Sequence, residues 1–195
     1  TRAATWRRLG LAWGFRFTPQ PGPTGIFAST PRGRGGRVYV KDLNSNVDAL
    51  NAATGALLWR KRFAQMDGGP NGLAAGYGRS YGNTSHDVFA LNAETGELVW
   101  LRRLVHRRSA EIDIAPIVAN YLVYTSSIGP PPGGRGILYA LDAATGRPRW
   151  TFYKILARCT FPPEDAGVGA CSPVCLYVDG AVVAGLSILY AWCGT

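Results

Sequence analysis

The densest group of ionisable side chains that could do chemistry is Arg107, Arg108, Glu111 and Asp113, in the segment that begins at His106. Guanidinium groups bind carboxylates in bidentate fashion, and carboxylates can ligate a hard cation or accept a proton. The segment is therefore a candidate binding site. The alternative is a solvated loop of mixed charge, which is the commoner meaning of such a composition.

The histidines and cysteines match no catalytic or metal-binding spacing. The only two histidines are His86 and His106, and neither is spaced as in a Ser/His/Asp or metal site. Cys171 and Cys175 have no histidine after them, so covalent haem attachment is not indicated. Structural or unpaired thiols are the interpretation, and the four cysteines allow three disulfide pairings in an oxidising compartment.

The elements that must position these residues are defined by an internal repeat. The pattern Ala-Leu-Asn/Asp-Ala-x-Thr-Gly-x-x-x-Trp occurs three times, within residues 47–59, 88–100 and 138–150. The tryptophans recur at a spacing of roughly 40 to 50 residues, which is typical of propellers and solenoids.

Each repeat predicts a β-hairpin. Its Asn or Asp side chain can bond the backbone two residues on, and its glycine can take the left-handed conformation that closes the turn. We therefore expect positive φ angles at Gly55, Gly96 and Gly146. A second pair of strands precedes each hairpin, and four short antiparallel strands per repeat make one propeller blade.

The predicted fold class is all-β, a β-propeller of four-stranded antiparallel blades, incomplete, with about three whole blades and parts of a fourth. We expect one domain over residues 1–195, with an outermost strand at 11–17, blades at 29–63, 70–104 and 114–154, and a partial blade at 172–195. An opening strand that completes the last blade would close a four-bladed ring, which is the alternative arrangement.

The repeat resembles that of the pyrroloquinoline quinone (PQQ) repeat propellers. This family includes quinoprotein alcohol dehydrogenases, polyvinyl alcohol dehydrogenase-like proteins and non-enzymatic lipoproteins of outer-membrane assembly. The resemblance implies that Trp59, Trp100 and Trp150 occupy buried positions between blades, each against the glycine of an adjacent repeat. Asn51 and Asn92 replace the aspartate that is usual in the family.

In the enzymes of the family, PQQ is held with a calcium-type cation beside an aspartate base. The resemblance implies Asp113 as the base, Glu111 and Asn71 as cation ligands, and Arg107 and Arg108 as quinone-binding residues. If the chain is part of a quinoprotein, we expect Glu111 and Asp113 to point together toward the central channel, because alternation along an extended segment would put both on one face. The adjacent cysteine pair that these enzymes often carry is missing.

The net charge of +9 raises the question of nucleic-acid binding. The basic residues follow the repeat tryptophans, at 60–62 and 102–103, where they would protect the edge of an outermost strand from aggregation. We therefore expect no nucleic-acid partner. No apolar run is long enough for a transmembrane segment, and the family resemblance implies a periplasmic or secreted location.

The composition changes at residue 158. All lysines and arginines lie at or before Arg158, and all cysteines lie at or after Cys159. A disulfide-bearing fourth blade and a sequence error near this point are alternative explanations. Residues 159–195 are expected to be less regular than the preceding blades.

Two functions remain open from the sequence. The favoured one is an interaction scaffold without clear catalytic residues, whose partners are envelope proteins or further propeller blades. The alternative is part of a PQQ-dependent dehydrogenase that oxidises alcohols, with PQQ and calcium as cofactors.

Overall fold

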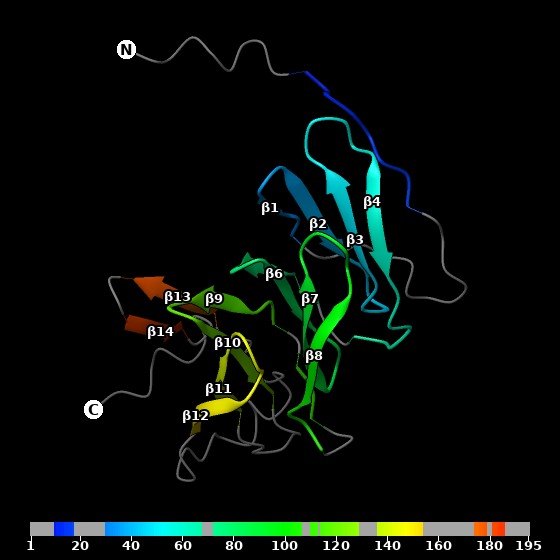
Figure 1. Ribbon diagram of the computed structural model, residues 1–195. Helices are drawn as coiled ribbons and strands as arrows, with labels where there is room; N and C mark the ends of the chain where they lie inside the picture. Colours follow the sequence, from blue (N-terminus) through cyan, green and yellow to red (C-terminus); the bar gives the residue numbers. More distant parts are fainter. Residues whose placement is uncertain are drawn as a thin grey trace, which may run out of the picture.

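The structure is a computed structural model that describes residues 10–17, 30–67, 72–106, 110–112, 114–128, 136–153, 174–178 and 181–185. Its described residues form β-strands and turns without a helix. The chain is an incomplete β-propeller with three four-stranded antiparallel sheets (Figure 1), as the sequence predicts.

The sheets follow one another along the chain. Blade 1 contains β1 (Arg32–Arg34), β2 (Arg37–Lys41), β3 (Val47–Asn51) and β4 (Leu57–Lys61). Blade 2 contains β5 (Ala74–Gly76), β6 (Arg79–Asn83), β7 (Asp87–Asn92) and β8 (Leu98–Arg103). Blade 3 contains β9 (Ile117–Ala119), β10 (Leu122–Ser127), β11 (Ile137–Asp142) and β12 (Pro148–Tyr153).

The first strands of the blades are neighbours across the blade boundaries. β5 contacts both β1 and β9, and within each sheet the strands pair in sequence order. The first strands therefore lie on the inner side, and β4, β8 and β12 are the outermost strands. β13 (Val174–Val178) and β14 (Ala181–Gly185) pair with each other as a separate antiparallel sheet. The remainder of 159–195 lies outside the described residues.

The repeated hairpin closes in the same way in all three blades. In blade 1 the Asn51 side-chain oxygen accepts hydrogen bonds from the backbone N–H groups of Ala53 and Thr54, at 2.9 and 3.1 Å. Gly55 N donates to Asn51 O, and its φ of 72° confirms the predicted left-handed conformation. The corresponding φ angles in blades 2 and 3 are 74° and 68°, at Gly96 and Gly146.

The aspartate version of this turn in blade 3 also shows why an acidic residue suits it. Asp142 Oδ1 accepts hydrogen bonds from the hydroxyl and backbone N–H of Thr145 and from the backbone N–H of Ala144. These bonds favour the ionised form, with the Thr145 hydroxyl as the largest cause, and they lower the pKa of Asp142.

Blade 2 buries both of its faces. Phe89 and Leu91 pack toward blade 1, whereas Val88 and Ala90, one residue out of phase, pack toward blade 3. Successive side chains of a strand point to opposite faces, so a strand between two other blades must be apolar on both. This explains the continuous buried run of β7.

The repeat tryptophans fasten one blade to the next. The Trp59 indole N–H donates to Ala93 O at 3.1 Å, and a Cβ built on Gly96 would lie 2.6 Å from the Trp59 ring. Trp100 makes the same pair of contacts one blade later, with Ala143 O and Gly146. The glycine thus has two functions, because it permits the left-handed turn and leaves room for the ring.

Trp13 makes the equivalent contact at the start of the chain. Its indole N–H donates to Ala52 O at 3.0 Å, and its ring packs on Gly55. Residues 10–17 belong to no sheet of the described chain, so their assignment as an outermost strand remains a prediction.

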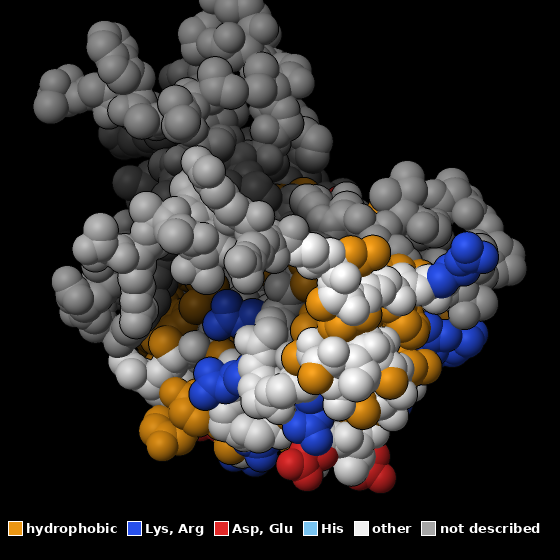
Figure 2. Space-filling model, turned by 90° about the horizontal axis from the view of Figure 1, so that it is seen from above, with side chains coloured by type: hydrophobic (Ala, Val, Ile, Leu, Met, Phe, Trp, Pro, Cys, Tyr) orange, Lys and Arg blue, Asp and Glu red, His pale blue; other side chains and the backbone are white. Residues whose placement is uncertain are grey.

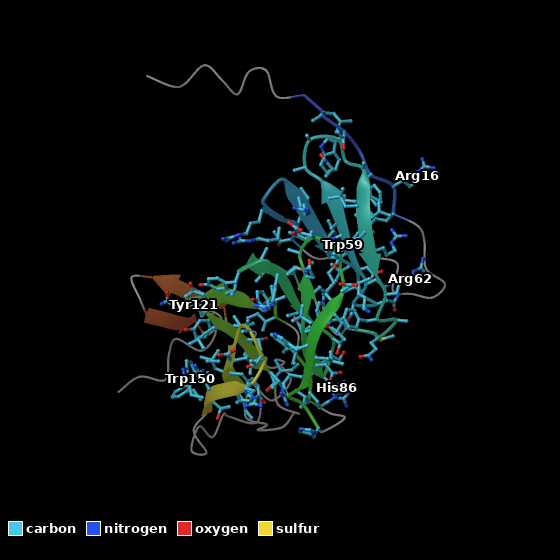
Figure 3. All side chains as sticks on the ribbon, in the orientation of Figure 1. Arg16, Trp59, Arg62, His86, Tyr121 and Trp150 are labelled. Carbon is cyan, nitrogen blue, oxygen red and sulfur yellow. The ribbon has the colours of Figure 1, made fainter. Side chains whose placement is uncertain are left out.

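Trp150 corrects one expectation. It has the same register as the other tryptophans, opposite Ala140, and its ring is 6.0 Å from that of Tyr124. However, it is 41% exposed, whereas Trp59 is 8% exposed. The prediction of a buried Trp150 is wrong because no described glycine turn packs on it. Figure 3 shows Trp150 on the side of blade 3 that faces away from blade 2.

Two alanine substitutions can separate the contribution of the tryptophan–glycine contact to stability from the cost of placing a side chain at a positive φ. Gly96→Ala and Gly78→Ala both place a side chain at a positive φ, 74° and 70°, but only Gly96 has a ring against its Cβ position. We expect Gly78→Ala to cost about 1–2 kcal/mol. We expect Gly96→Ala to cost about 1–3 kcal/mol more, because Trp59 must move. Urea unfolding measures both, and equal costs would contradict the importance of the contact.

The tryptophans themselves should differ in their contribution to stability. Trp59→Ala removes a buried aromatic side chain and is expected to cost about 3–5 kcal/mol. Trp150→Ala removes a side chain that is 41% exposed and should cost less than about 2 kcal/mol. Thermal and urea unfolding of the two variants give the comparison. A loss for Trp150→Ala as large as that for Trp59→Ala would show that Trp150 is buried in solution.

Candidate functional site

The connections between blades and the loops between second and third strands lie at the same end of the strands, because every pairing is antiparallel. We call this end the loop face. It carries the parts of 62–73 and 104–116 that the structure describes, and with them the surroundings of the predicted site residues.

The loop of blade 1 is organised by Asp42. Its carboxylate accepts hydrogen bonds from Asn44 N, Asn46 N and Asn46 Nδ2, at 2.8–2.9 Å. Asn46 Oδ1 in turn accepts from the backbone N–H groups of Phe63 and Ala64. The connection that leaves β4 is therefore held to the loop of its own blade.

The loop of blade 2 links two connections. The Ser85 hydroxyl donates to Met66 O at 2.7 Å, and Ser85 O accepts from Ile112 N at 2.7 Å. His86 O accepts from the backbone N–H groups of Leu104 and Val105. The Asn83 amide donates to Ile112 O at 3.2 Å. The loop face is thus a continuous hydrogen-bonded layer across the three blades.

A groove of about 420 Å³ opens on this layer. Its lining comes from the connection between blades 1 and 2, the loop of blade 2, the outermost strand β8 and the connection between blades 2 and 3. The lining residues are, in this order, Gln65 and Met66, Ser85 and His86, Arg103, and Glu111. Arg103 is already paired with Asp87 through two bonds of 2.7 and 3.0 Å, which raise the pKa of Arg103. His86 and Glu111 are the remaining ionisable groups of the lining.

Glu111 is the one candidate of the predicted cofactor site that the structure describes. Its main chain pairs with Ile128, and Ile128 N donates to Glu111 O at 2.8 Å. Glu111 is half-buried and the next residue, Ile112, is fully buried, as expected for an extended segment. Asn71, Arg107, Arg108 and Asp113 lie outside the described residues, so the predicted convergence of Glu111 and Asp113 remains a prediction.

The sequence analysis missed a buried ion pair near the same face. Lys41, at the end of β2, pairs with Asp67 and donates to Asn83 O at 2.6 Å. Burial lowers the pKa of Lys41, and the Asp67 carboxylate opposes that effect. The sequence carried a signal for the burial of Lys41 but not for its partner, because alternation along 37–41 places Lys41 on the same inward face as Tyr39.

Within the described residues, no three His, Cys, Asp or Glu side chains lie close enough to hold a metal ion. This part of the chain also has no helix of the length and hydropathy needed to cross a membrane. The structure describes the side chain of none of the four cysteines, so the disulfide pairing stays a prediction.

The three blades, their repeated turns and their tryptophan–glycine contacts define a propeller of the PQQ-repeat class. Residues 43–184 match the family model described as outer membrane protein assembly factor BamB. The chain belongs to this family of PQQ-repeat propellers.

The quinohemoprotein alcohol dehydrogenase ADH-IIG of Pseudomonas putida is 33% identical over 173 residues, which cover 83% of this chain and 24% of the relative. The solved structure of ADHIIG from Pseudomonas putida HK5 superposes with a TM-score of 0.63 at 29% identity, over 75% of this chain and 23% of that one. The chain therefore spans about a quarter of the length of these relatives.

The structure of BamB from Moraxella catarrhalis superposes with a TM-score of 0.57 at 20% identity. The match covers 83% of this chain and 44% of that chain. At this identity the likeness establishes the fold alone.

The buried ion pair gives a prediction with a built-in control. Asp67→Ala leaves the Lys41 ammonium buried without its carboxylate partner, and should cost about 3–5 kcal/mol. The double variant Lys41→Met/Asp67→Leu replaces both charges with apolar groups of similar size and should recover most of that loss. Urea unfolding at neutral pH measures both.

The pH dependence of Asp67→Ala gives a further check on the same pair. Without Asp67, the pKa of Lys41 in the folded protein falls further below its unfolded value. The unfolded state then binds more protons, so the free energy of unfolding should rise as the pH is raised toward about 10. The double variant should lack this rise, and the same rise in both would contradict the assignment to Lys41.

Proposed function

We propose that this chain is part of an extracytoplasmic propeller that acts as an interaction scaffold for envelope proteins. The observation that carries the proposal is the use of the aspartates. All five aspartates of the described residues hold the fold together: Asp42, Asp48, Asp67, Asp87 and Asp142. The described aspartates thus support blades and turns.

The family supports the same proposal. The matching family model carries the description of an outer-membrane assembly factor, and the match spans most of the chain. The hydrogen bonds of the loop face fix its backbone in one arrangement. A pre-organised surface loses less conformational entropy on binding, which favours its use in recognition.

A second function is favoured by a different observation, the 33% identity to a quinohemoprotein alcohol dehydrogenase over 83% of the chain. In that case PQQ and a calcium-type cation would supply the oxidising chemistry, with Asp113 as the base. Arg107 and Arg108 would bind the quinone carboxylates, and Glu111 and Asn71 would ligate the cation. A cation site needs several oxygens converging within about 2.3–2.6 Å. Of this set, only Glu111 is described, and it lies beside Arg103 and His86 in an open groove.

The two functions can be separated with the full-length gene product. The protein is incubated with PQQ and calcium chloride, and quinone binding and dye-linked oxidation of primary alcohols are measured. The scaffold proposal predicts no saturable quinone binding and no alcohol oxidation. Glu111→Gln and Asp113→Asn are the matched variants, because each removes a charge with little change of shape.

Alcohol oxidation by the unchanged protein that falls by about a hundredfold or more in Asp113→Asn would establish the dehydrogenase instead. In that event Glu111→Gln should weaken the calcium dependence of activity, which separates a ligand from a base.

A further inference from the structure

The turns that join the first two strands of each blade lie at the end of the strands opposite the loop face. We call this end the turn face. Each turn has two central residues with positive φ: Gly35 and Gly36 in blade 1, Tyr77 and Gly78 in blade 2, and Asn120 and Tyr121 in blade 3. Such two-residue turns match the twist of a hairpin but demand left-handed backbone at both positions.

Tyr77 and Tyr121 occupy positions where glycine is the unstrained choice. Their φ angles are 51° and 60°, and a bulky side chain in this region carries a steric cost that glycine avoids. Blade 1 shows the unstrained solution, because its turn uses two glycines. Strained residues at a surface turn carry a cost in stability, and such strain is concentrated at functional positions.

The two tyrosines form a pre-arranged pair across the boundary of blades 2 and 3. Their rings are stacked, with centroids 4.3 Å apart and planes at 20°. Tyr121 N donates a hydrogen bond of 3.0 Å to the Tyr77 hydroxyl. Nevertheless, Tyr121 is 72% exposed and Tyr77 is 40% exposed. Figure 3 shows Tyr121 beside β9 and the hairpin of β13 and β14, well apart in this view from His86 of the loop face.

Three arginines flank these turns. Arg34 and Arg37 lie on either side of the glycine pair of blade 1, and Arg79 follows the turn of blade 2. Arg34 reaches over to blade 2, where it donates to Ala75 O at 3.2 Å. None of the three belongs to an ion pair of the described residues.

The described carboxylates at this end of the blades belong to the outer hairpins instead: Glu94, Glu97 and Asp142. In the view of Figure 2, from above Figure 1, Lys and Arg side chains lie at several places and Asp and Glu side chains lie at the lower edge. The inner part of the turn face is therefore aromatic and positively charged.

We propose that Tyr77, Tyr121, Arg34, Arg37 and Arg79 form a docking surface for an acidic peptide segment of a partner protein. Tyrosine and arginine are the residues that most often dominate binding energy at protein interfaces, and the uncompensated guanidinium groups select a partner of opposite charge. This inference rests on the proposed scaffold function and adds a second surface, at the opposite end of the blades from the loop face, together with the chemistry through which it binds.

Glycine substitution tests the surface without harming the fold. Tyr77→Gly/Tyr121→Gly gives a Gly-Gly turn in blade 2, as in blade 1, and an Asn-Gly turn in blade 3. The substitutions relieve the strain of both turns but remove the ring stacking and the bond to the Tyr77 hydroxyl, so we expect only a small net change in stability, which urea unfolding measures first. The probe is a fluorescein-labelled octapeptide of alternating Glu and Tyr, titrated with the full-length protein and followed by fluorescence anisotropy. The matched peptides alternate Gln with Tyr and Lys with Tyr.

We expect the Glu/Tyr peptide to bind, and the affinity to fall by about tenfold or more in Tyr77→Gly/Tyr121→Gly. Arg34→Gln/Arg37→Gln should weaken binding and its dependence on salt. Arg62→Gln, at an exposed arginine of the connection after β4, is the matched control and should bind as the unchanged protein does. Binding of the Gln/Tyr peptide with equal affinity would overturn the role of charge.

Two further outcomes would overturn the proposal. One is unchanged affinity in the double tyrosine variant. The other is tighter binding of a fluorescein-labelled thymidine octanucleotide than of the Glu/Tyr peptide, which would indicate nucleic acid as the partner. Neither outcome would establish alcohol oxidation, so a failure of this surface stays distinct from a failure of the scaffold proposal in the PQQ and calcium assay.

Discussion

The contact between an indole ring and a glycine of the next blade is the interaction on which the rest of this structure depends. The glycine closes its own hairpin at a positive φ, and the absence of its side chain admits the tryptophan of the neighbouring blade. One residue therefore couples local turn formation to the packing of blades. The indole N–H bond to an alanine carbonyl of the same turn fixes the register of the two sheets. Blade 2 both receives Trp59 from blade 1 and gives Trp100 to blade 3, so blade 2 couples the stability of its two neighbours.

This coupling explains which features could be read from the sequence. The hairpins and the conformations of Gly55, Gly96 and Gly146 are local consequences of residue type, so the repeat predicts them. The exposure of Trp150 is not local, because burial depends on a partner turn that the repeat pattern of the tryptophan itself does not contain. The pairing of Lys41 with Asp67 is missed for a similar reason, since it joins a strand end to a connection that sequence periodicity cannot place.

The two ends of the strands use their residues in different ways. At the loop face, side-chain oxygens of Asp42, Asn46 and Ser85 hold the connections by hydrogen bonds, so most polar groups there serve the backbone. At the turn face, the central side chains of two turns contact each other across a blade boundary, since the Tyr77 hydroxyl accepts a bond from Tyr121 N and the two rings stack. Both rings nevertheless remain exposed. The candidate cofactor residues follow from family resemblance, whereas the tyrosine pair follows from strain and exposure alone. Its signal in the sequence is a bulky residue at a position where the first blade has glycine.

The fold by itself does not choose between a scaffold and an oxidoreductase, because PQQ-repeat blades occur in relatives of both kinds. The choice depends on how charged groups are used. A cation site must keep several carboxylate or amide oxygens unpaired and convergent, at a cost in stability that bound metal repays. In the described blades the aspartates are instead bound to arginine, lysine and turn N–H groups, which leaves their oxygens with structural partners. At the turn face, arginines that belong to no described ion pair flank two tyrosines whose backbone is strained. A surface that is pre-organised in this way loses less conformational entropy when a partner binds, and this use of the charged groups is the reason for which we propose an interaction scaffold.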